Sequence, residues 1–155
     1  MNEMAKQLLD SQRSGVYQLL VLPEEVERAA GEASLGTFRI DIRGVQDKKD
    51  FLDRVAEALS FPEWFGANWD ALNDRFGDID PAQSKSGYVF ILENSDDFML
   101  ATRREFNNAV KVFQSAAEYW KSERRPFWAF IQFSERDDSG LPKWPEVGAE
   151  HDRHE

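Results

Sequence analysis

The sequence predicts an α/β fold built on a small parallel sheet. From residue 38 onward, short apolar segments alternate with segments of helical periodicity, in the order strand, helix, helix, strand, helix, strand. The apolar run at 88–92 is nearly continuous, as expected for a strand that is covered on both faces. Because strands that alternate with helices pair in parallel through right-handed crossovers, we expect three parallel strands packed by helices. A further strand at 16–22 is expected at one edge of this sheet.

The N-terminal segment, residues 1–35, is predicted to be an addition that packs on the main domain. Its pattern favours a short helix within 1–12 and an apolar strand at 16–22 that ends at Pro23. A short helix over 24–30 follows, with acidic residues in its first turn.

The main domain is predicted to span residues 36–134. Alternating apolar and polar residues indicate a half-buried strand at 37–43, and Asp47 is a suitable N-cap for the helix that follows it. A long helix is expected over 103–121 and a last strand at 127–133. The long helix is indicated by one apolar stripe, formed by Phe106, Val110, Phe113, Ala117 and Trp120.

The C-terminal segment, residues 135–155, is predicted to be a polar tail. Leu141 and Trp144 are its expected tethers to the domain. His151 and His154 stand three residues apart in this tail, where a frayed terminus is a better account than a metal site.

The composition bounds the class of protein. The 155-residue chain is the length of one domain, and its hydrophobic fraction of 41% allows a substantial core. It has 29 acidic and 19 basic side chains, for a formal net charge of −10. That charge disfavours nucleic acid and anionic membranes and favours basic partners, although a solvated acidic surface that serves only solubility also accounts for it. The absence of Cys excludes disulfides and thiolate chemistry. Without a signal-peptide pattern or a membrane-length apolar stretch, we expect a cytoplasmic protein, and a monomer.

A second helix of the main domain, expected over 69–76, combines an apolar face with an acidic one. Asn68 is a natural N-cap for it, and Gly77 a natural end. The apolar face consists of Trp69, Leu72 and Phe76. Another face of this helix carries Asp70, Asn73, Asp74 and Gly77.

Asp74 has no local structural reason to be acidic. Asp70 lies in the first turn, where the helix dipole favours a carboxylate, but Asp74 lies near the C-terminal end, where the dipole disfavours one. It also faces Asp70 at a like-charge i, i+4 spacing. Residues 63–80 hold five acids and one base. A functional anionic patch therefore explains this segment better than helix stability does.

Catalysis by these carboxylates is the less favoured interpretation. Paired carboxylates that do general acid–base chemistry usually come from different elements that line a cleft, whereas this pair lies on one exposed helix face. No third ligand is spaced to complete a metal site, and no phosphate-binding glycine motif or HExxH motif occurs. We therefore expect no enzyme activity, no cofactor and no metal.

The stretch from residue 61 to residue 74 resembles the signature of the barstar family, the intracellular protein inhibitors of barnase-type ribonucleases. The matching residues are Phe61, Pro62, Glu63, Trp64, Phe65, Gly66, Asn68, Asp70, Ala71, Leu72 and Asp74. The resemblance implies the family's compact α/β fold and an acidic helix that plugs the active site of a basic extracellular-type ribonuclease or related toxin. In this interpretation Asp74 enters the phosphate site, Asp70 pairs with a second base and Trp64 stacks on the enzyme's catalytic face.

The contact surface implied by the resemblance consists of Trp64, Asn68, Asp70, Asn73, Asp74 and Asp78. Asn68 either contacts the partner or only caps the helix. Three positions depart from the family pattern: Asn73 replaces a Trp, Asp78 stands where an aromatic is common, and Ser115 replaces a Glu. Since specificity depends on such surrounding contacts, the resemblance implies a basic ribonuclease without pointing to barnase itself. The alternative is a protein-binding or immunity module on the same scaffold with a non-nuclease partner.

Overall fold

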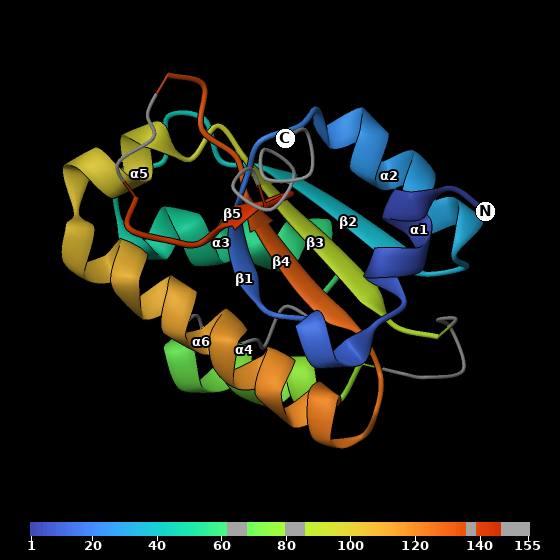
Figure 1. The fold of residues 1–155 in the computed structure, drawn as a ribbon. Helices are drawn as coiled ribbons and strands as arrows, with labels where there is room; N and C mark the ends of the chain where they lie inside the picture. The colour runs from blue at the N-terminus through green and yellow to red at the C-terminus, as the bar shows by residue number, and fades with distance from the viewer. Residues whose placement is uncertain (62–67, 80–85, 136–138, 147–155) are drawn as a thin grey trace.

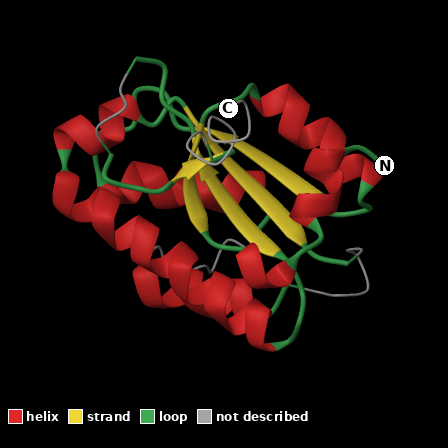
Figure 2. Cartoon of the chain, in the orientation of Figure 1, coloured by secondary structure: helices red, strands yellow, loops and turns green. Residues whose placement is uncertain are grey.

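The computed structural model describes residues 1–61, 68–79, 86–135 and 139–146. Its helices and strands are shown in Figures 1 and 2. In chain order they are α1 (Glu3–Leu8), a 3-10 turn (Ser11–Arg13), β1 (Val16–Leu19), α2 (Pro23–Glu32), β2 (Gly36–Asp41), α3 (Lys48–Ala58), α4 (Trp69–Gly77), β3 (Tyr88–Glu93), α5 (Asp96–Ala101), α6 (Arg103–Ser122), β4 (Phe127–Ile131) and β5 (Lys143–Trp144). Within these described residues, no helix is both long enough and apolar enough to cross a membrane.

The strands of the described residues form one sheet of five parallel strands in the order β2-β3-β4-β1-β5. The α/β class and the parallel pairing are as predicted, but the expected sheet of three strands with one further edge strand is wrong, since the sheet of the described residues has five strands. The expected edge position of β1 is also wrong, because β1 lies between β4 and β5. The backbone amide of Gln18 donates to the carbonyl of Pro142 at 2.8 Å, and that of Leu20 donates to Trp144 at 2.9 Å. β5 was not predicted, because two residues in a polar segment do not form a recognisable strand pattern.

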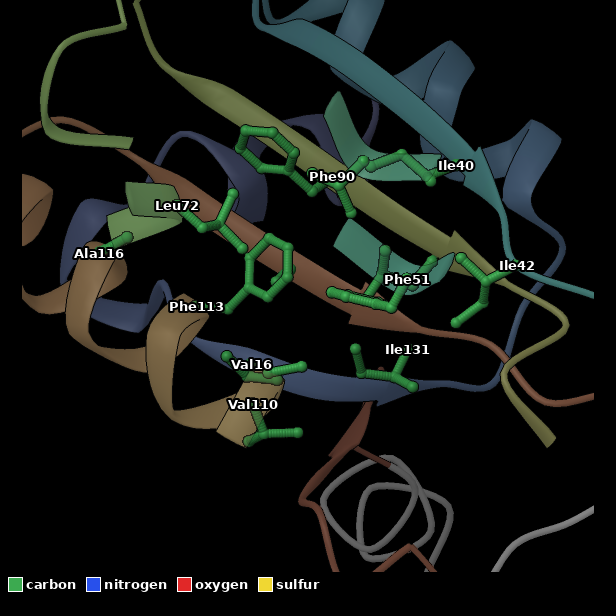
Figure 3. Packing of buried hydrophobic residues seen from close by; sticks show 14 of the residues in the cluster. Val16, Ile40, Ile42, Phe51, Leu72, Phe90, Val110, Phe113, Ala116 and Ile131 are labelled. Atoms are coloured by element: carbon green, nitrogen blue, oxygen red, sulfur yellow. The ribbon is translucent and has the colours of Figure 1, made fainter. Parts of the chain in front are cut away.

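Helices cover both faces of the sheet, so the molecule has three layers (Figure 2). On one face, α3, α4, α5 and α6 pack over the larger core, which includes Phe90, Phe113 and Ile131 (Figure 3). On the other face, α1 and α2 pack over a smaller core that includes Val89 and Trp128. Successive residues of β3 thus enter opposite cores, which confirms the prediction of a strand covered on both sides.

Most predicted helices of the main domain lie where the sequence indicated, within one or two residues. The carboxylate of Asp47 accepts a hydrogen bond from the Asp50 amide at 2.8 Å, which confirms the predicted N-cap of α3. The sequence did not indicate α5, a six-residue helix after β3. In the C-terminal segment, Trp144 is buried and Leu141 packs on the larger core, as expected of tethers.

Arg39 connects α2 to the sheet. From β2, its guanidinium donates to Glu93 of β3 at 2.7 and 2.9 Å. It also donates to Glu27 and Glu24 of α2, at 3.1 Å in each case. The hydrogen bonds to Glu93, above all, raise the pKa of Arg39 above its ordinary value, so this group stays charged. The segment before residue 35 is therefore joined to the main domain by charge as well as by apolar packing.

Candidate functional site

Helix α4 has the capped start and the buried face that the sequence predicted. The side-chain oxygen of Asn68 accepts a hydrogen bond from the Ala71 amide at 2.7 Å, which satisfies one amide of the first turn. Leu72 and Phe76 are fully buried. Trp69 is partly buried and packs against Phe51, with 5.7 Å between ring centroids.

Two tryptophan side chains fix α4 to α6, one near each end of α4. The indole of Trp69 donates to the carboxylate of Glu105 at 3.1 Å, and the indole of Trp120 donates to the carbonyl of Phe76 at 3.0 Å. The second bond satisfies a last-turn carbonyl that has no partner within the helix. The amide of Asn108 donates to Glu105 at 2.9 Å and, together with the Trp69 indole, holds the pKa of that carboxyl below its ordinary value. The outer side of α4 is therefore presented on a well-anchored element.

The predicted polar face of α4 is exposed and available. Asp70, Asn73, Asp74 and Asp78 are all exposed. Among the interactions of the described residues, none of these four side chains makes a hydrogen bond or an ion pair. The basic residue of this helix, Arg75, lies with its guanidinium over the ring of Phe61, 4.9 Å from the centroid. The carboxylates on the outer side of α4 are thus free to meet a cation from outside.

A shallow, open groove of about 560 Å³ runs between α4 and α6. Its α4 wall is formed by Asn73, Asp74, Gly77 and Asp78. Its α6 wall is formed by Ser115, Ala116 and Tyr119. Asp70 does not line this groove, so the carboxylates that share it are Asp74 and Asp78 rather than the pair Asp70 and Asp74 that the sequence emphasised.

The three positions that depart from the family pattern, Asn73, Asp78 and Ser115, meet in this groove. They are scattered in the sequence, and the packing of α4 against α6 brings them together. Tyr119 was missed by the sequence reasoning. It lies one position before the buried Trp120 and off the apolar stripe of α6, and an aromatic residue on the polar side of a helix was the signal that could have revealed it.

Asn68 and Trp64 differ from the other predicted contact residues, which are exposed and make no side-chain hydrogen bond or ion pair among the described residues. The side-chain oxygen of Asn68 is used in capping α4, although the residue itself is exposed. Trp64 lies outside the described residues, so its predicted role stays a prediction.

The arrangement suits recognition of a cationic surface. Its carboxylates lie on the open side of a helix and beside a groove, where a protein surface can reach them. In the described ranges, no three His, Asp or Glu side chains gather closely enough to hold a metal ion. Charged hydrogen bonds from a basic partner are the interactions that this geometry can form best.

Comparison with known proteins gives a similar fold and identifies the family of this chain. The fold is similar to that of the Aeropyrum pernix ORC2 protein in its ADPNP–ADP complexes, with a TM-score of 0.55 and 14% sequence identity. That similarity covers 84% of this chain but only 38% of the length of that one, and at this identity it concerns the fold alone. A comparison with curated proteins gave no match. The family model described as Barstar (barnase inhibitor) matches residues 35–132, from the start of β2 to the end of β4. The chain therefore belongs to the Barstar family.

Proposed function

We propose that this protein inhibits a barnase-type ribonuclease by binding the enzyme's basic active site and occluding it with the outer side of α4. One observation carries the proposal: an anchored helix exposes Asp70, Asn73, Asp74 and Asp78, with no internal partner for their side chains among the described residues. The family to which the chain belongs is described as an inhibitor of barnase.

Each acidic side chain has a role in this proposal. An enzyme that binds RNA phosphates must present cationic side chains, and carboxylates held on a fixed helix can take the places of those phosphates. Asp74 would enter the phosphate site and Asp70 would pair with a second base. Trp64 would stack on the catalytic face, and Asn68 would add a polar contact next to the cap that it forms. Because α4 is fixed at both ends by indole hydrogen bonds, little conformational entropy would be lost on binding.

A non-catalytic role fits the site better than an enzymatic one. Two carboxylates that act as acid and base must flank the same scissile bond of a substrate, usually from the walls of a cleft. Here the groove is shallow and includes Asp74 but not Asp70. Its neutral positions, Asn73 and Ser115, favour a second candidate function, an immunity or binding module for a toxin that is not a nuclease.

The proposal is tested by titrating RNA cleavage by barnase and by other small basic extracellular ribonucleases with the full chain. Asp74→Asn keeps the size of the side chain and removes its charge. We expect it to weaken inhibition by about 2 kcal/mol or more, the range of interface hot spots, for which the barnase–barstar pair is itself a reference case. The free energy of unfolding should stay unchanged or rise by a few tenths of a kcal/mol, because Asp74 opposes the helix dipole.

Glu3→Gln is the matched control. It removes one exposed carboxylate from α1, on the far face of the sheet, and should leave inhibition unchanged. Salt should slow association of the wild-type chain, since charge attraction guides the encounter. The inhibitor proposal is wrong if no ribonuclease of the panel is inhibited and capture from the source cell recovers no nuclease.

A further inference from the structure

The groove between α4 and α6 has two unlike walls. The α4 wall places the carboxylates of Asp74 and Asp78 on one side. The α6 wall is low at Ser115 and at the buried Ala116, and one large side chain, Tyr119, rises beside them with half of its surface exposed. The groove is therefore acidic along one side and aromatic on the other.

The ring of Tyr119 is held in place from behind. It meets the buried ring of Trp120 edge to face, with 5.2 Å between centroids and an angle of 77°. Trp120 is itself fixed to the end of α4 by its hydrogen bond to the carbonyl of Phe76. An exposed aromatic ring that is already oriented loses little freedom when a partner covers it.

No basic side chain is among the described residues that line this groove. Arg75 is turned toward Phe61, and Lys121 of α6 pairs with Glu118 at 3.1 Å. Among the described residues, neither carboxylate of the groove makes an ion pair or a side-chain hydrogen bond, so charge complementarity favours a cation from a partner.

We propose that the groove binds one arginine side chain of a partner protein, with its guanidinium on the ring of Tyr119 and its N–H groups directed to Asp74 and Asp78. A guanidinium is planar, stacks on aromatic rings and donates several hydrogen bonds in its plane. An ammonium group could meet the carboxylates, but it is more strongly hydrated and cannot stack in this way. Tyr119 would thereby determine which basic surface binds. This inference rests on the proposed function, since it concerns the same contact surface.

The test is an NMR titration of the isotope-labelled full chain with acetyl-arginine amide and, separately, with acetyl-lysine amide at constant ionic strength. We expect arginine to shift the backbone amide signals of Asn73, Asp78, Ser115 and Tyr119 and to bind roughly three- to tenfold more tightly than lysine. Equal affinities, an absence of shifts at these residues, or shifts spread evenly over the acidic surface would overturn the proposal.

Variants of Tyr119 examine the ring itself. Tyr119→Ala should abolish the preference for arginine, whereas Tyr119→Phe should keep it because the ring remains. Leu100→Ala, at an exposed apolar residue of α5, is the control and should behave as the wild type. The stacked arrangement would be contradicted if Tyr119→Ala still preferred arginine to lysine, or if Tyr119→Phe lost that preference.

Ribonuclease inhibition is measured in parallel, so the two proposals can fail separately. If Asp74→Asn loses inhibition while Tyr119→Ala retains it in full, the inhibitor proposal stands and the arginine site is wrong. If no ribonuclease is inhibited but the arginine titration gives the expected result, the groove binds arginine and the inhibitor proposal fails.

Discussion

Glu105 makes the stability of the contact between α4 and α6 depend on pH. Its carboxylate accepts hydrogen bonds from Asn108 on its own helix and from the indole of Trp69 on α4. These donors, that of Asn108 first, lower its pKa in the folded chain. The charged form is thus favoured by folding, so its contribution to stability is present above the ordinary pKa of glutamate and is lost as the pH falls through the lowered value.

We therefore expect Glu105→Gln to flatten the loss of stability in acid. Between about pH 5 and pH 3, the free energy of unfolding should fall less steeply in the variant than in the wild type. Trp69→Phe removes the indole donor and keeps a ring in the core. This variant should reduce the pH dependence of the free energy of unfolding in part. Urea unfolding at a series of pH values measures this, and parallel curves for wild type and Glu105→Gln would refute it.

At the level of single residues, the sequence predicted exposure better than it predicted partners. Helical periodicity alone placed Asp70, Asn73 and Asp74 on the outer side of α4, where they are found. It could not reveal that Asp74 shares a groove with Tyr119, because that depends on how α4 packs on α6, a helix far away in the chain.

Between elements, the ion pairs of Arg39 hold α2 against the edge strand β2. Arg39 is about 29% exposed and Glu93 16%, so their bond is better shielded than an ordinary surface pair. Arg39→Met should keep the aliphatic contacts and lower the free energy of unfolding by about 2 kcal/mol, since it leaves Glu93 without its partner.

The matched control for this change is Lys49→Met, which breaks an exposed pair with Asp53 on α3. Exposed pairs contribute about 0–1 kcal/mol, so the control should cost clearly less. Chemical denaturation of both variants measures the difference. Equal losses would show that the Arg39 network is worth no more than a surface pair.

Elements with strong patterns were predictable, and short ones were not. The stripe of α6 and the apolar run of β3 repeat over enough residues to be recognised without tertiary contacts. α5 has six residues and β5 has two, and their stability comes from packing that no local pattern records. The internal position of β1 follows from β5, so one missed element changed the predicted order of the sheet.

For the whole molecule, the segment before the family match is part of the fold. Its removal would delete β1 from between β4 and β5 and uncover one face of the sheet. The large side chains exposed would include Val89, Ile91, Trp128 and Phe130. Each contributes about 1.5–3 kcal/mol when buried, against about 5–15 kcal/mol of total stability for a domain.

We therefore expect a chain that begins at Leu35 to be insoluble or unfolded. Near-ultraviolet circular dichroism and binding of a hydrophobic dye measure this. Co-expression of residues 1–34 as a separate fragment should restore folding, because the same contacts re-form. A shortened chain with native stability would show that the two cores are independent.

The two cores on opposite faces of the sheet have a practical consequence for anyone who attaches this protein to a support. Met1 is exposed at the start of the chain and leads into α1, which packs on the face of the sheet opposite to α4. A tag or surface linkage at the N-terminus would thus attach the molecule through the face of the sheet that α1 covers. The acidic side of α4 would then remain turned toward the solution. Sensor chips, affinity resins and fusion proteins should be built from that end.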